Sequence, residues 1–199
     1  MVKETLKITI ILTIVFSFLA CNPIENDTKS SSMLIVEKIT GTDLENNEAN
    51  FLQSDVLIED PDTGAGSIRA DSAIATLKAE LLDPEPLLGS SVYNNIMVTH
   101  YVVSYTRSDG KNTEGVHVPH SFDGNLSALV EIGSSVDISF IIVKAVAKAE
   151  PPLVNLTGVH GEGVLTVTSK IDFYGHDLSN RNVKATGYLT IEFSNYVNE

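Results

Sequence analysis

Much of the chain after residue 50 alternates between apolar and polar residues with a period of two, which is typical of strands with one buried face. The clearest case is the C-terminal part, where residues 165–173 and 184–193 each place mostly apolar side chains on one face. Residues 175–182, which separate the two segments, are rich in turn formers. The pattern therefore predicts an antiparallel hairpin whose apolar face lies in the core.

Three further segments predict strands. Residues 96–107 are β-branched and aromatic and apolar on both faces, as in a central strand. In residues 136–149 the apolar positions change from even to odd numbers, which predicts a β-bulge. Residues 72–82 alternate but have the composition of a helix, so both remain open; we favour a strand because its neighbours are strands.

These segments together predict an all-β fold, an antiparallel β-sandwich with about seven to nine strands. The sandwich is expected to be immunoglobulin-like or jelly-roll-like. The core tryptophan and the disulfide of antibody domains are both missing, because the chain has no tryptophan and one cysteine. The prediction therefore concerns the architecture alone.

The N-terminus has the pattern of a secretory signal. Lys3 and Lys7 precede an apolar run over residues 8–20, after which the chain becomes polar. A transmembrane helix needs about 20 apolar residues, so the run is too short to span a bilayer. We therefore expect a leader that is removed.

The residues Phe18-Leu19-Ala20-Cys21 resemble the bacterial lipobox, with Phe18 at the position where leucine is usual. The resemblance implies cleavage before Cys21 and lipid attached to it, and more than one acyl chain anchors a protein durably. Cys21 cannot form an internal disulfide, because it is the only cysteine. The alternative is an ordinary secretory leader with a cysteine near its cleavage site. Asn22 is not the aspartate associated with inner-membrane retention, which favours an outer membrane if the organism has one.

The predicted organisation is a lipoprotein signal peptide at 1–20, a flexible polar tether at 21–32 and a single sandwich domain at 33–199. Removing the leader takes away two lysines and one glutamate, which leaves 11 basic and 25 acidic residues in the mature chain. This acidic balance makes nucleic-acid binding and electrostatic docking on anionic membranes improbable.

Two groups of residues could bind a metal ion. His117 and His120 are close in sequence and could ligate a transition metal. Asp60 and Asp62 precede Gly64 in a pattern similar to part of a calcium loop, although the later glutamate is missing and a plain turn is the alternative. No other cofactor is expected.

The sequence contains no nucleophile elbow, phosphate loop or dinucleotide fingerprint. Residues 105–113 and 173–177 look like stretches of small uncharacterised bacterial lipoproteins, a resemblance that implies no activity. We favour a non-enzymatic binding or structural module, whose loops at 60–69, 109–120 and 176–182 contact an envelope protein or polysaccharide. The alternative is a metal-dependent enzyme or a carbohydrate or small-ligand binder that uses His117, His120, Glu114 and Asp123. Without tryptophan, a sugar-stacking platform would depend on Tyr93, Tyr101, Tyr105, Tyr174, Tyr188 and Tyr196.

Overall fold

The computed structural model describes residues 29–59, 62–87, 89–157 and 163–196, and the structural statements below concern these residues. They form eleven strands, a one-turn helix α2 (Ala145–Lys148) and two 3-10 turns, η1 (Val92–Asn94) and η2 (Leu153–Thr157). The strands are β1 (Ser32–Thr42), β2 (Glu48–Ala49), β3 (Phe51–Asp55), β4 (Ile58–Glu59), β5 (Gly66–Ser67), β6 (Asp71–Leu81), β7 (Ile96–Thr106), β8 (Phe122–Val130), β9 (Ser135–Val143), β10 (Leu165–Asp177) and β11 (Asn182–Ser194).

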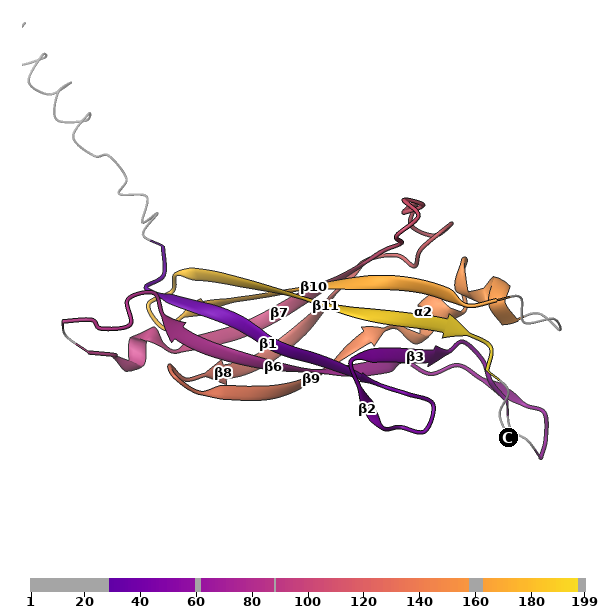
Figure 1. Cartoon of the computed structure of the whole chain (residues 1–199), viewed down its shortest axis with the longest axis horizontal. Coiled ribbons are helices and arrows are strands. Elements are labelled where there is room, and N and C mark those ends of the chain that lie inside the picture. Colours follow the sequence, from indigo (N-terminus) through magenta and orange to yellow (C-terminus); the bar gives the residue numbers. More distant parts are fainter. Residues whose placement is uncertain (1–28, 60–61, 88, 158–162, 197–199) are drawn as a thin grey trace, which may run out of the picture.

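Two sheets face each other in an elongated sandwich (Figure 1). One sheet has the order β2-β1-β6-β9 and the other β3-β11-β10-β7-β8, while β4 and β5 form a separate small hairpin. All pairs are antiparallel except β3 with β11, which run parallel. The predicted all-β sandwich is therefore confirmed, with one parallel pair that the prediction did not include.

The strand order favours the immunoglobulin-like alternative. Strands β1, β6 and β9 occupy the places of A, B and E, and β11-β10-β7-β8 follow the order G, F, C and C′. Eight strands have five or more residues, within the predicted seven to nine. The two-residue strands β2, β4 and β5 are additional, because such short pairings leave no alternating pattern in the sequence.

The C-terminal hairpin is confirmed as a central part of the core. Leu165 pairs with Phe193 and Val167 with Ile191, and all four side chains are buried. Ser169 lies in the same buried row because its hydroxyl donates to the Leu189 carbonyl at 2.8 Å.

Close packing of the two sheets requires a glycine in β11. A Cβ atom at Gly187 would lie 2.5 Å from Cδ1 of Ile39 in the opposite sheet, which is too close for any larger residue without movement. Beside it, Phe140 and Phe173 meet edge to face with centroids 5.4 Å apart.

Strand β7 is central, as predicted, but its buried residues do not fill both faces. Ile96 and Val98 are buried before a bulge at Thr99, and Tyr101 and Val103 are buried after it. The bulge shifts the inward-facing positions of β7 from even to odd residue numbers. Apolar residues therefore occur at both even and odd positions, although only one face of the strand is buried.

The segment 136–149 is only partly a strand. A register shift at Ile142 confirms the predicted bulge, but β9 ends at Val143 and the chain then forms α2. The segment 72–82 is the strand β6, as we favoured.

The folded unit begins inside the predicted tether. Ser30 is buried, and its hydroxyl donates to a carboxylate oxygen of Asp177 at 2.7 Å. The predicted signal peptide, Cys21 and the tether up to residue 28 lie outside the described residues. Within the described part of the chain, no helix is long and apolar enough to cross a membrane.

Candidate functional site

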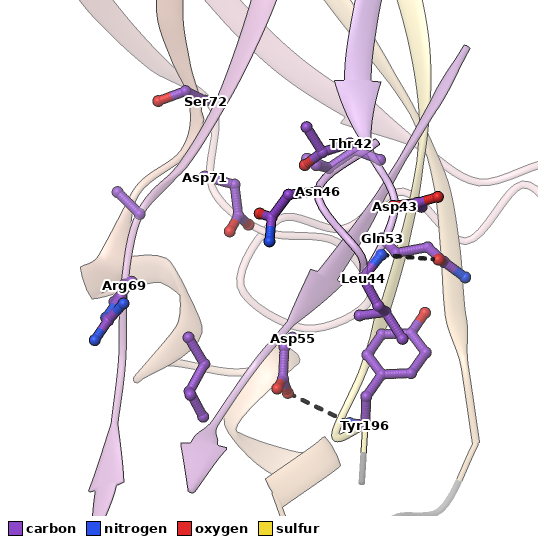
Figure 2. Close-up of a pocket in the computed structure, with 13 residues that line it drawn as sticks. Thr42, Asp43, Leu44, Asn46, Gln53, Asp55, Arg69, Asp71, Ser72 and Tyr196 are labelled. Carbon is purple, nitrogen blue, oxygen red and sulfur yellow. Dashed lines mark hydrogen bonds between the residues drawn. The ribbon is translucent and has the colours of Figure 1, made fainter. Parts of the chain in front are cut away.

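A polar cavity of about 610 Å³ opens at one end of the sandwich. It lies where β1 ends, at Thr42, and therefore at the end opposite to Ser32 (Figures 1 and 2). The surrounding residues come from β1 and the loop after it, from β3, from the start of β6 and from the C-terminal segment. The lining residues are Thr42, Asp43, Leu44, Asn46, Leu52, Gln53, Asp55, Ile58, Arg69, Ala70, Asp71, Ser72 and Tyr196.

One wall is a tight loop that Asp43 holds together. Its carboxylate accepts hydrogen bonds from the backbone N–H of Glu45 at 2.9 Å and of Asn47 at 2.8 Å, and from the Asn47 amide at 3.0 Å. The side-chain hydrogen bond from Asn47 is the main reason why the pKa of Asp43 lies below its usual value. Asn46 adopts a left-handed backbone with φ 64°, which places its amide on the cavity wall near Asp71 (Figure 2).

The second wall combines β3 with the end of the chain beyond β11. The Gln53 amide oxygen accepts a hydrogen bond from the Leu44 N–H at 3.3 Å, and the Gln53 amide nitrogen takes no part in this bond. Asp55 accepts from the backbone N–H of Leu57 and of Tyr196, each at 3.3 Å. The phenol of Tyr196 lines the same wall, and burial is the main cause that raises its pKa.

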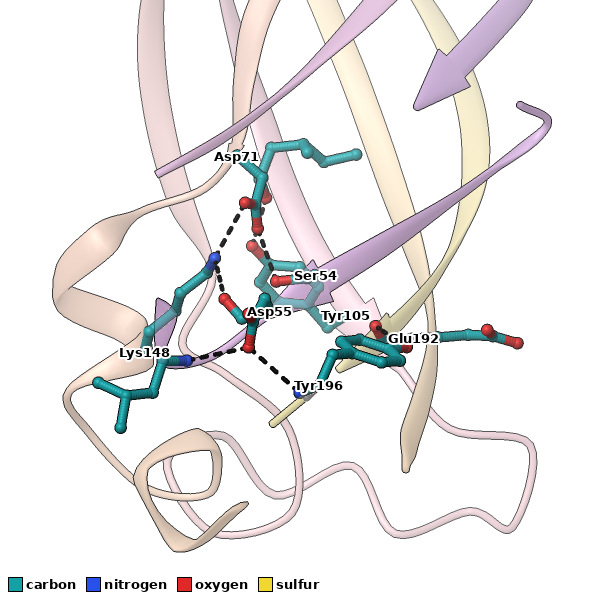
Figure 3. Close-up of polar contacts among 9 residues, drawn as sticks. Ser54, Asp55, Asp71, Tyr105, Lys148, Glu192 and Tyr196 are labelled. Atoms are coloured by element: carbon teal, nitrogen blue, oxygen red, sulfur yellow. Dashed lines mark hydrogen bonds and ion pairs between the residues drawn. The ribbon is translucent and has the colours of Figure 1, made fainter. Parts of the chain in front are cut away.

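The floor is an ion pair between Lys148, which is buried, and Asp71, whose side chain is 19% exposed (Figure 3). The Lys148 side chain is 1% exposed, and its ammonium donates to Asp71 Oδ1 at 2.9 Å and to the Asp55 carbonyl at 2.7 Å. Ser54 donates to the other oxygen of Asp71 at 2.6 Å. Burial raises the pKa of the Asp71 carboxyl, and the charge of Lys148 and the hydrogen bond from Ser54 oppose this effect. Helix α2, β3 and β6 are thereby tied together beneath the cavity.

A tyrosine supports this floor from the core. Tyr105 donates its hydroxyl hydrogen to the Ile142 carbonyl at 2.6 Å. Burial, with the nearby charge of Asp71, holds the pKa of Tyr105 well above its usual value. The phenol therefore stays neutral and keeps its donor role.

The geometry suits binding better than covalent catalysis. Ser54 is fully buried and donates its proton to Asp71, so its oxygen is not presented to a ligand as a nucleophile. The Lys148 ammonium donates to two oxygen atoms and cannot serve as a base while it is so engaged. Arg69 is exposed at the rim, and no ion pair between described residues involves it.

The predicted histidine pair lies elsewhere, in the loop between β7 and β8. His120 Nδ1 is 3.6 Å from a carboxylate oxygen of Glu114, while Nδ1 of His117 is buried without a hydrogen-bond partner. Asp123 lies on β8 and pairs with Val102 of β7. Among the described residues, no three histidine, cysteine or acidic side chains form a group that could hold a metal. Transition-metal binding by His117 and His120 stays a prediction.

The acidic pair that resembled part of a calcium loop is only half described. Asp62 is exposed in the turn between β4 and β5, and Asp60 lies outside the described residues. Calcium binding there also stays a prediction. Arg69, at the end of the predicted contact loop 60–69, lies between β5 and β6 and lines the cavity.

The tyrosines are not gathered at the cavity. Tyr101 and Tyr105 are buried in the core. Tyr174 lies on the outer face of its sheet between His100 and Lys184, its partners on the two neighbouring strands. Its ring stacks on that of His100 with the centroids 4.8 Å apart, and the Lys184 ammonium lies 5.0 Å from the Tyr174 centroid. Its ring faces are therefore occupied, and Tyr196 is the one aromatic residue that lines the cavity.

Sequence reasoning missed most of the cavity. Its lining residues are far apart in the chain and carry no motif, so topology alone brings them together. A weak signal is Lys148, a lysine that stands between Ala147 and Ala149. Comparisons with protein-family models, with curated proteins and with solved structures find no match for this chain.

Proposed function

We propose that the chain is a lipid-anchored binding module of the cell envelope, attached through Cys21, which binds a small hydroxylated ligand such as a mono- or disaccharide in the cavity. The observation that carries this proposal is the polar cavity of about 610 Å³ at the end of the sandwich. That volume lies within the roughly 300–1,000 Å³ of typical ligand sites. The proposal combines the non-enzymatic envelope module that the sequence favoured with the small-ligand or carbohydrate binding that belonged to the alternative.

The chemistry of the lining supports a ligand with many hydroxyl groups. Asp55 and Asp71 offer acceptors, Arg69 offers donors, and Asn46 and Gln53 offer amides. A sugar hydroxyl both donates and accepts, so it can pair with each of these groups. The ion pair with Lys148 holds the Asp71 carboxylate in place before a ligand binds, which reduces the conformational entropy lost on binding.

The lipid anchor is supported by the sequence around Cys21 and fits the position of the cavity. β1 has eleven residues, so it spans about 33 Å between Ser32 and Thr42. A protein attached through residues before Ser32 would therefore present the cavity away from the membrane, toward the polymers of the envelope. An outer membrane is favoured if the organism has one.

Binding is tested by titrating neutral mono- and disaccharides, including N-acetylglucosamine and its dimer, in calorimetry and thermal melts. A ligand that binds only the native state raises the melting temperature. Asn46→Gly removes the amide and suits the left-handed backbone, so it should weaken binding and leave the fold intact. Asn180→Gly is the matched control, because Asn180 has the same φ of 64° and lies outside the cavity. If no sugar changes the melt, or both variants weaken binding equally, the cavity is not the site.

The anchor is tested in cells by labelling with a fatty-acid analogue and by detergent partitioning. The natural chain should incorporate the label and enter the detergent phase. Cys21→Ser should lose the label and appear in the aqueous phase. A Cys21→Ser protein that fractionates with membranes as before contradicts the lipoprotein proposal.

A further inference from the structure

Apolar side chains are exposed in the connection between β6 and β7, of which residues 82–87 and 89–95 are described. The exposed fractions are 58% for Leu82, 68% for Val92 and 62% for Tyr93, and Leu87 is completely exposed. Scattered single apolar residues on a surface are ordinary, but four in one loop are not. We call this segment the apolar loop.

The apolar loop lies beside the point where the chain enters the fold. The Leu82 N–H donates to the Ser31 carbonyl at 2.9 Å, and the Asn94 amide donates to the Ser31 hydroxyl at 2.8 Å. Figure 1 shows the loop and the start of β1 together at one end of the sandwich. The loop is therefore fixed next to the segment that leads back to Cys21.

Hydrogen bonds order the described part of the loop that leads into β7. Ser91 caps η1 through a reciprocal pair of hydrogen bonds with Asn94, and Gly89 has φ 73° with its N–H bonded to the Pro86 carbonyl. Asn95 is held by Ile132, whose N–H donates to its side chain at 3.1 Å, and by Leu178, whose N–H donates to its carbonyl at 3.0 Å. These contacts fix the position of η1, which carries the exposed side chains of Val92 and Tyr93.

We propose that the apolar loop inserts into the lipid bilayer as a second membrane contact beside the lipid on Cys21. The inference rests on the proposed lipid anchor. Eight residue steps separate Cys21 from Lys29, a reach of at most about 29 Å when fully extended. The anchor thus keeps this end of the sandwich near the membrane, where exposed Leu, Val and Tyr side chains find an apolar environment.

The charges near the loop indicate the kind of membrane. Asp83 and Glu85 lie within it, and the chain as a whole has a formal net charge of −13. Anionic headgroups would repel these carboxylates, so the insertion is hydrophobic and favours neutral lipids such as phosphatidylcholine or phosphatidylethanolamine. The contact thus differs from the electrostatic docking that the composition makes improbable.

The test uses the mature lipidated protein in phosphatidylcholine vesicles whose acyl chains carry bromine, which quenches tryptophan on contact. The chain has no tryptophan, so Leu87→Trp creates a single emitter in the loop. Tyr93→Trp is a second reporter in case the first impairs folding. Val116→Trp is the matched control, because Val116 is also exposed, at 58%, and follows β7 at the opposite end of the strand.

We expect the tryptophan at position 87 to be blue-shifted and to lose most of its emission, and the tryptophan at position 116 to stay unquenched. Adding anionic phosphatidylglycerol should reduce the quenching. Equal emission from both positions in floating vesicles overturns the insertion while leaving the anchor intact. Protein that fails to float with the vesicles contradicts the anchor itself, so the two failures are distinct.

Discussion

Replacing Lys148 with methionine should destabilise the protein far more than replacing a surface lysine. Methionine keeps much of the length of the side chain but removes the charge that faces Asp71. The variant also loses the hydrogen bond to the Asp55 carbonyl. The carboxylate of Asp71 would then stay buried against Ser54 without its cation.

Breaking a buried ion pair by removing one partner costs about 3 to 5 kcal/mol. A domain has roughly 5 to 15 kcal/mol of stability in total, so the loss would be visible at once. Lys38→Met is the matched control, since Lys38 pairs with Glu48 where both side chains are more than half exposed. An exposed pair contributes about 0 to 1 kcal/mol.

The pH dependence separates an uncompensated charge from simple loss of packing. Burial already raises the pKa of Asp71, and without Lys148 this effect is less opposed. A carboxyl with a raised pKa in the folded state contributes stability that is present below its unfolded pKa and is lost as the pH rises through its folded pKa. The Lys148→Met variant should therefore approach the natural protein in stability as the pH falls toward about 4.

The assay is urea unfolding followed by circular dichroism between pH 4 and pH 8, with the midpoint and the slope fitted separately. A double variant, Lys148→Met with Asp71→Asn, should lose less stability than Lys148→Met alone, because no buried charge is left without a partner. If Lys148→Met costs the same as Lys38→Met, or if its cost does not change with pH, the proposed role of the ion pair is wrong.

Three further variants test the sandwich by the same unfolding measurement. Phe173→Ala, in the buried face of the hairpin, should cost about 3 to 5 kcal/mol, whereas the exposed Tyr188→Ala should cost much less; equal costs would contradict the two-faced hairpin. Gly187→Val should destabilise by about 1 to 3 kcal/mol through overpacking against the opposite sheet, and an unchanged midpoint would show that the sheets can separate freely. Partial burial acts to raise the pKa of Asp172, but hydrogen bonds from Thr186 and two lysines bring it below 3.8. The contribution of Asp172 to the free energy of unfolding is therefore lost as the pH falls below about 4. Asp172→Asn should reduce the loss of stability in acid, and an unchanged dependence of stability on pH would contradict this role of Asp172.

Alternation in the sequence was sufficient to predict the long strands, because burial of one face constrains every second residue. The hairpin of β10 and β11 shows this most clearly, since Leu165, Val167, Ile191 and Phe193 are all buried as predicted. For β6, whose composition is that of a helix, we chose a strand because its neighbours are strands, and this choice is correct. In β6, tertiary packing outweighs the helix propensity of the residues.

The errors arose where the chain changes phase or depends on distant residues. The bulge at Thr99 made β7 look apolar on both faces, and α2 continued the apparent alternation of β9. Asn46, Asp71 and Tyr196 meet in the cavity because β1, β6 and the end of the chain converge there. No local spacing encodes such a meeting, so the site could not be read from the sequence.

The two ends of the sandwich differ in chemical character for a reason that the topology supplies. The long strands pair side by side along the length of the domain, so the connections between them lie at its two ends. At the end near Ser31 the connection exposes Leu87 and its apolar neighbours, and at the other end the connections place Asn46 and Arg69 around a polar cavity. Under our proposals the lipid on Cys21 and the apolar loop act at the same end of the sandwich, and the polar cavity at the other end faces away from the membrane.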